Sequence, residues 1–117
     1  SHAVSIERIN LADGVPIMYE TNLFPYQKFA FLLEEPLDGS LFELLEKKCH
    51  TIVSYSNNSY LDLARASGRI AKELRVPNRE PLFFLYSEGY DSNNELVYIG
   101  KDYVLADQYR FYLDDPK

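Results

Sequence analysis

Two charged side chains fall on strand-like segments near the start of this 117-residue chain. Arg8 lies in an alternating segment, residues 4–10, and Glu20 follows an apolar run within residues 15–24. If both side chains face the same shielded side of a sheet, each needs a partner, because a buried unpaired charge is costly. They can form a mutual salt bridge, or they can bind a polar ligand. In the second case Arg8 would pair with an anionic group, and Glu20 would accept hydrogen bonds from hydroxyl or amine donors.

The chain offers little else that could carry out catalysis. Cys49 and His50 suggest a Cys/His nucleophile, but adjacent side chains on a strand point to opposite faces and would not meet. The glycines are all isolated, so there is no glycine-rich phosphate loop. No Cys/His cluster has the spacing of a zinc site, and a single cysteine cannot form an internal disulfide. We therefore expect no catalytic residues, no metal and no cofactor.

Aromatic side chains are unusually common, since ten Tyr and seven Phe make up 15% of the chain. In β-rich domains most such residues belong to the core or to cross-strand pairs. Tyrosine also has an apolar body and a hydrogen-bonding tip, which suits the wall of a small-molecule pocket. A cavity over a sheet is therefore a second interpretation, lined by some of the tyrosines on predicted strands: Tyr19, Tyr55, Tyr86, Tyr90, Tyr98 and Tyr103.

Composition excludes several classes of protein. The chain has the size of one domain and is 46% apolar. Its 18 acidic and 12 basic residues give a net charge of −6, which argues against binding of nucleic acid or an anionic membrane by this segment. The basic residues within 65–79 are better explained as a solvated helix face. No apolar run approaches the ~20 residues of a membrane span, and cysteine usage suits a cytoplasmic location.

Local patterns predict the elements that would position these residues. Residues 4–10 and 15–24 form a predicted β-hairpin, because Ala12-Asp13-Gly14 favours a tight turn with positive φ. Ser40 has the side chain of an N-cap, and Glu43 three residues later completes a capping box. A helix with buried leucines should therefore begin at residue 41.

The second half of the chain alternates between strand and helix patterns. Residues 49–60 have β character, and from Leu61 a helical spacing takes over until Pro77 ends it. Strands are predicted over 81–90 and 96–105, with 109–112 prolonging the last one. The order β-β-α-β-α-β-β indicates an α+β fold built on a mainly antiparallel sheet. The helical stripe consists of Leu63, Ala66, Ile70 and Leu74.

An ordered series of motifs covers nearly all of residues 6–111. No single motif is decisive, but the series resembles the UTRA domain, the effector-binding half of bacterial GntR-superfamily regulators of the HutC type. The matching segments are Ala12-Asp13-Gly14-Val15-Pro16 with Glu20, Gly39-Ser40-Leu41-Phe42, residues 70–77, Glu80-Pro81-Leu82, residues 89–97 and residues 102–111.

The resemblance implies a chorismate-lyase-like α+β fold without lyase activity. It implies a homodimer in which a small metabolite binds over the sheet and changes the operator affinity of N-terminal winged helix-turn-helix domains. Residues 4–113 would be this effector-binding domain, shortened at its start and separated from its DNA-binding domain. We expect residues 1–3 to be a remnant of tag removal.

Family pocket positions can be transferred one at a time, beginning with the polar ones. Members that bind sugar phosphates tend to have an Arg-x-Arg pair on the first strand, which here becomes Arg8 and Asn10. The hairpin glutamate matches Glu20. The helix-start serine matches Ser40, whose hydroxyl and backbone N–H could hold an anion at the positive helix end.

The remaining pocket positions depart from the family pattern. Phe42 replaces a tyrosine and lacks its hydroxyl, and Tyr98 replaces a glutamate. The late family tyrosine falls at Val104, beside Tyr103. The expected effector is thus an anionic metabolite, either a sugar phosphate or a carboxylated, amino-acid-like or aromatic-compatible compound.

Two other functions stay open at this point. A small enzyme of the same fold, such as a lyase acting on an aromatic acid, would need a second acid or base beside Glu20. A purely structural dimerisation module would have an Arg8–Glu20 pair, a face filled by tyrosines and no ligand cavity.

Overall fold

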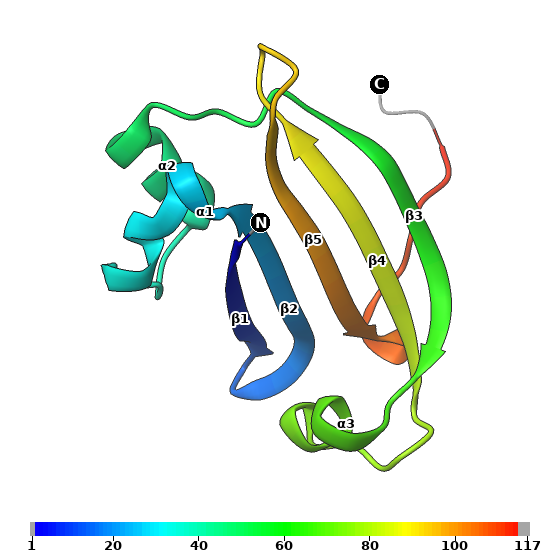
Figure 1. The fold of residues 1–117 in the computed structure, drawn as a ribbon. Coiled ribbons are helices and arrows are strands. Elements are labelled where there is room, and N and C mark those ends of the chain that lie inside the picture. The colour runs from blue at the N-terminus through cyan, green and yellow to red at the C-terminus, as the bar shows by residue number, and fades with distance from the viewer. Residues whose placement is uncertain (1, 115–117) are drawn as a thin grey trace.

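The fold is a single antiparallel sheet with helices on both faces, seen here in a computed structural model that describes residues 2–114 (Figure 1). Ser1 of the expected tag remnant lies outside the described residues. The strand order β1-β2-β5-β4-β3 confirms the α+β prediction. The elements are β1 (Ala3–Ala12), β2 (Val15–Pro25), α1 (Tyr26–Phe29), η1 (Ala30–Glu34), α2 (Leu41–Cys49), β3 (Tyr55–Arg65), α3 (Gly68–Leu74), β4 (Pro81–Tyr90), β5 (Leu96–Leu105) and η2 (Ala106–Gln108).

The β1–β2 hairpin forms where its turn residues predict. Asp13 and Gly14 have φ values of 50° and 79°, and two consecutive positive φ angles give the tight turn whose twist matches the flanking strands. The resulting register places Arg8 directly opposite Glu20. Cross-strand partners share one face of a sheet, so this turn alone brings the two charges to the same side.

One face of the sheet, called here the α2 face, carries the larger core. Helix α2 begins as predicted, with Ser40 Oγ accepting a hydrogen bond from the Glu43 N–H at 3.3 Å. Its buried leucines share one core with residues of β1, β2 and the short helical turns α1 and η1. Figure 1 shows α1 and α2 on the same side of the sheet. The fully buried members of this core are Val4, Ile6, Phe24, Phe29, Leu32, Leu41, Leu45 and Val97.

The opposite face, called here the α3 face, has its own core. Helix α3 lies beside the turn end of the β1–β2 hairpin (Figure 1). Arg69 on α3 forms an ion pair with Glu7 on β1 at 3.2 Å, and Glu7 also accepts a hydrogen bond from Tyr19. The buried residues of this core are Tyr19, Ala66, Ala71, Leu74, Leu82 and Leu105.

The predicted helix from Leu61 to Pro77 was wrong over its first half. Strand β3 continues to Arg65, and α3 ends at Leu74 with Arg75 in the left-handed conformation. The cause is that residues 60–65 pair with β4 at the edge of the sheet, so their leucines are not buried. Leu63, assigned to a helical core stripe, is 81% exposed.

Two smaller predictions also need correction. Residues 109–112 do not prolong β5, because the 3₁₀ turn η2 separates them from it. Cys49 and His50 are not on a strand: Cys49 is the last residue of α2, and His50 is its left-handed cap. Cys49 Sγ lies 3.3 Å from the Leu45 carbonyl oxygen, so the thiol is turned back along its own helix.

Candidate functional site

The candidate site is built around an ion pair on the α2 face. Arg8 Nη2 lies 3.3 Å from Glu20 Oε1, and the two side chains are 24% and 17% exposed. The pair therefore adopts the mutual salt bridge that was one of the two interpretations. Both groups remain partly accessible from the sheet surface.

Arg8 also connects β1 to the start of α2. Its Nη1 donates to the carbonyl oxygens of Gly39 at 2.7 Å and Leu37 at 3.3 Å. These bonds hold the loop that precedes Ser40 and α2 against the sheet. The Ser40 hydroxyl oxygen already accepts one hydrogen bond as the cap of α2, which leaves its O–H as a donor and one further lone pair as an acceptor.

The Glu20 carboxylate is held by two amides as well as by Arg8. Asn10 Nδ2 donates to Oε1 at 3.4 Å, and Asn22 Nδ2 donates to Oε2 at 3.0 Å. Asn22 is only 5% exposed, and the sequence interpretation missed it. The carboxylate thus has a fixed orientation with partners on both oxygens.

Asp102 on β5 is the second carboxylate of the site, and it was also missed. It lies opposite Glu20 in the β2–β5 register and so shares the α2 face. Its Oδ1 is buried and finds no hydrogen-bond partner within residues 2–114. Burial and the negative charge of Glu20 raise the pKa of Asp102 to about 6. The only signal in the sequence is a single acid within a predicted strand, directly after Lys101.

Aromatic rings form a wall at one end of this polar cluster. Tyr98 lies 5.2 Å from Phe42 and 6.3 Å from Phe24 between ring centroids. Its ring covers two glycines of the sheet: a Cβ on Gly89 would overlap the ring, and one on Gly100 would lie 3.1 Å from it. The Tyr98 ring can pack flat against the sheet because Gly89 and Gly100 have no side chains.

Asn22 links the aromatic wall to the charged cluster. Its Nδ2 binds Glu20, while its Oδ1 lies beside Gly100, under the edge of Tyr98. The structure therefore gathers most of the expected site on one face, but not Tyr103. That ring lies on the α3 face, 4.9 Å from the ring of Phe84, because it is one residue out of phase with Asp102.

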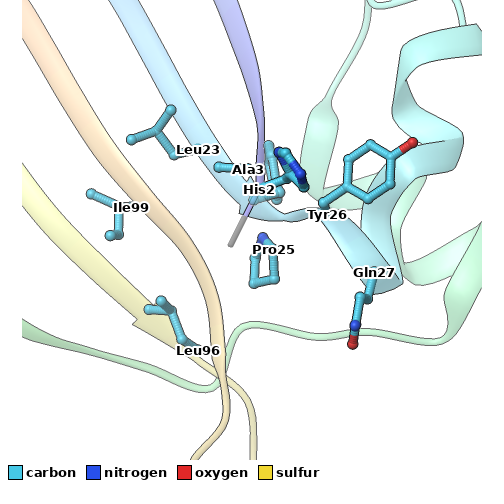
Figure 2. Close-up of a pocket in the computed structure, with 9 residues that line it drawn as sticks. His2, Ala3, Leu23, Pro25, Tyr26, Gln27, Leu96 and Ile99 are labelled. Atoms are coloured by element: carbon cyan, nitrogen blue, oxygen red, sulfur yellow. The ribbon is translucent and has the colours of Figure 1, made fainter.

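A cavity at the end of β2 lies apart from this cluster. About 770 Å³ of space opens where the end of β2 meets α1 and β5 (Figure 2). Leu23 and Ile99 line it from the α3 face, and its lining contains none of the six tyrosines proposed above and no carboxylate. A smaller hollow of about 190 Å³ lies at the start of α2, beside Gly39 and Ser40. Only the second one adjoins the charged cluster.

Two further properties bear on the kind of protein. Within residues 2–114, no group of three or more His, Cys, Asp or Glu side chains could hold a metal ion. In the same part of the chain, no helix is long and apolar enough to cross a membrane.

Replacing Asp102 with Asn is expected to stabilise the domain at pH 8 by about 1–2 kcal/mol, with a smaller gain at pH 5. The folded pKa of about 6 lies above the usual 3.8, so the stability linked to this proton is complete below pH 3.8 and lost as the pH rises through 6. Asparagine cannot ionise and avoids this loss. Urea unfolding at both pH values measures the difference.

The matched control for this prediction is Asp107→Asn, which removes the same charge from an exposed position on η2. It should change the free energy of unfolding equally at pH 5 and pH 8. If the free energy of unfolding depends on pH in the same way in both variants, folding does not raise the pKa of Asp102.

Solved structures of several proteins share this architecture. The C-terminal domain of Yurk from Bacillus subtilis superimposes with a TM-score of 0.88 at 19% identity, covering 97% of this chain and 78% of that chain. A GntR-family transcriptional regulator from Enterococcus faecalis gives a TM-score of 0.84 at 23% identity, covering 97% and 81%. The effector domain of PhnF from Mycobacterium smegmatis gives 0.87 at 23% identity, covering 94% and 67%. At these identities the likeness establishes the fold.

Membership of a family follows from the sequence itself. A profile of the UTRA domain matches residues 1–110, which is almost the whole chain. The match includes β1, β2 and the start of α2, which carry Arg8, Glu20 and Ser40, and it extends through β5. The ordered motifs, the five-stranded sheet and this match agree, and the chain belongs to the UTRA domain family.

Proposed function

We propose that this chain is the ligand-sensing domain of a GntR-type transcriptional regulator of the HutC kind, acting by binding rather than by catalysis. The observation that carries the proposal is the half-buried cluster of Arg8, Glu20 and Asp102 in register across three strands. Three partly buried charges add little to the stability of a sheet, because the cost of removing them from water offsets their mutual attraction. A binding site gains specificity from them.

The signal would pass through the loop before α2. Arg8 holds this loop by its bonds to Gly39 and Leu37. A ligand that binds Arg8 or Ser40 would change the relative stability of two positions of the loop and of α2. A ligand shifts such an equilibrium only by its difference in affinity for the two states.

Operator DNA would be bound by an N-terminal winged helix-turn-helix domain rather than by this one. The net charge of −6 is unfavourable for contact with phosphates. The structure of PhnF from Mycobacterium smegmatis is about twice as long as this chain, which covers 48% of it. Such a regulator would act in the cytoplasm, where its operator lies.

The proposal is tested by thermal unfolding of the domain against a panel of sugar phosphates, carboxylates and amino acids. A ligand at 100 times its dissociation constant adds about 2.7 kcal/mol of stability. We expect a saturable shift with one chemical class, with affinity at least tenfold weaker in Arg8→Ala. Arg69→Ala, on the α3 face, should bind normally.

Other outcomes of this panel would assign a different function. A complete lack of shifts would favour the structural module, which also accounts for the Arg8–Glu20 pair. Chemical conversion of a bound compound would indicate an enzyme. Because Arg8→Ala also releases the loop before α2, Arg8→Lys serves as a second variant that retains the charge.

We also propose that the domain forms a homodimer through the edge of β3. This strand ends the sheet and has no partner on one side among the described residues, so its backbone groups can pair with a second copy. Leu61 and Leu63 are exposed on it.

Leu63→Glu should weaken dimerisation at least tenfold, measured by sedimentation equilibrium. Leu113→Glu is the control and should not weaken it, because Leu113 is also highly exposed but lies outside the strand. A dimer unaffected by Leu63→Glu would place the interface elsewhere.

A further inference from the structure

Two atoms of the charged cluster lack the hydrogen bonds that their burial requires. Arg8 Nε is a donor without an acceptor, and Asp102 Oδ1 is an acceptor without a donor, within residues 2–114. They lie on β1 and β5, on either side of Glu20 on β2. A buried polar atom left unpaired costs about 1–3 kcal/mol. A bound molecule that supplied both partners would remove this cost.

The charges of the cluster do not balance. Arg8 carries one positive charge, which the Glu20 carboxylate neutralises at 3.3 Å. Its Nη1 is also occupied by backbone carbonyl oxygens. Asp102 then adds a second negative charge, and no other cation in the described part of the chain forms an ion pair with either carboxylate. Lys101 precedes Asp102 on β5, and successive side chains of a strand point to opposite faces, so Lys101 lies on the α3 face.

We infer that the effector carries an ammonium group that binds Asp102, together with an acceptor group that faces Arg8. The inference rests on the proposed function of this site and names the class of ligand, a small zwitterion. Adjacent strands lie about 4.8 Å apart, so the backbones of Arg8 and Asp102 are roughly 10 Å apart across β2. The side chains of both residues shorten this distance, so the two groups of the ligand need to be separated by only a few bonds. An ammonium group supplies three donors and a positive charge. A hydroxyl supplies one donor and leaves the charge of Asp102 unbalanced.

The experiment compares pairs of compounds that differ only by amine against hydroxyl. The probes are glycine and glycolate, β-alanine and hydracrylate, and phosphoethanolamine and ethylene glycol monophosphate. Affinities are measured by ligand-dependent thermal unfolding and by calorimetry at pH 8, on the wild-type domain, Asp102→Asn and the control Asp107→Asn. Asp107 is an exposed acid on η2, so its replacement matches the change in net charge.

We expect at least one amine to bind tenfold or more tightly than its hydroxyl partner. That preference should disappear in Asp102→Asn and persist in Asp107→Asn. Because the asparagine variant is expected to be more stable at this pH, loss of amine binding cannot be attributed to unfolding.

The opposite results separate this inference from the proposed function. If hydroxyl compounds bind as tightly as amines, or if amine binding survives Asp102→Asn, the inference is overturned while the sensor remains. The inference is likewise overturned, and the sensor function kept, if only compounds without an amine bind in the panel of sugar phosphates, carboxylates and amino acids. If neither panel contains a ligand, both the inference and the proposed function fail.

Discussion

Phe24→Ala is expected to lower the free energy of unfolding by about 3–5 kcal/mol. Phe24 is 1% exposed and lies between the ring of Phe29, 5.5 Å away, and the ring of Tyr98, 6.3 Å away. Removing it would leave a cavity between β2, α1 and β5 that these rings can fill only partly. Domains of this size have total stabilities of about 5–15 kcal/mol, so the loss would be a large part of the whole. Urea unfolding monitored by circular dichroism provides the measurement.

Phe42→Ala is the matched control for this prediction. Phe42 contacts the same Tyr98 ring but is 47% exposed, so truncation should cost about 1 kcal/mol or less. Similar costs for the two variants would show that α1 and α2 are not packed on the hairpin as described. Phe24→Leu, which retains most of the volume, should lie between wild type and Phe24→Ala.

Gly89→Ala is expected to destabilise the domain by about 1–3 kcal/mol. The new methyl group would overlap the Tyr98 ring. The ring cannot move away freely, because Phe24 and Phe42 lie against it. Differential scanning calorimetry should show a lower Tm. The displacement of the ring should also alter the aromatic wall of the candidate site.

Gly39→Ala provides the comparison, since a Cβ at Gly39 meets nothing within 4 Å. This change should be neutral or slightly stabilising, because alanine restricts the unfolded chain. A double-mutant cycle with Tyr98→Ala isolates the cause of the Gly89 effect. In the absence of the ring, Gly89→Ala should cost less than half of what it costs in its presence. An unchanged cost would assign the effect to the backbone of β4 instead.

Local sequence signals were sufficient where the interacting residues are close along the chain. Asp13 and Gly14 impose the turn of the hairpin, and that turn sets the Arg8–Glu20 register. Ser40 and Glu43 define the start of α2 in the same local way. Apolar runs between turn residues predicted β4 and β5 over the residues that the structure shows, 81–90 and 96–105.

Periodicity failed where tertiary pairing outweighed it. Leu63 precedes α3 at helical spacing from Ala66, but it belongs to an edge strand that is held by its hydrogen bonds to β4. Leucines at such an edge are not buried, so their spacing carries no information about a core. The strand continues until Arg65, and only the seven residues from Gly68 to Leu74 form the helix.

The sequence by itself determined the hairpin, the cap of α2 and the ordered motifs of the UTRA family. It placed Arg8 and Glu20 on paired strands but did not decide that they form an ion pair. Only the tertiary structure decided that β5 lies beside β2, and hence that Asp102 faces Glu20 while Tyr103 faces away. The physical reason is that the alternation of side chains along a strand fixes which of its residues share a face of the sheet. It does not fix which other strand will pair with it. That choice is made by the burial of Phe24, Val97 and Tyr98 beneath α1 and α2, between segments more than seventy residues apart.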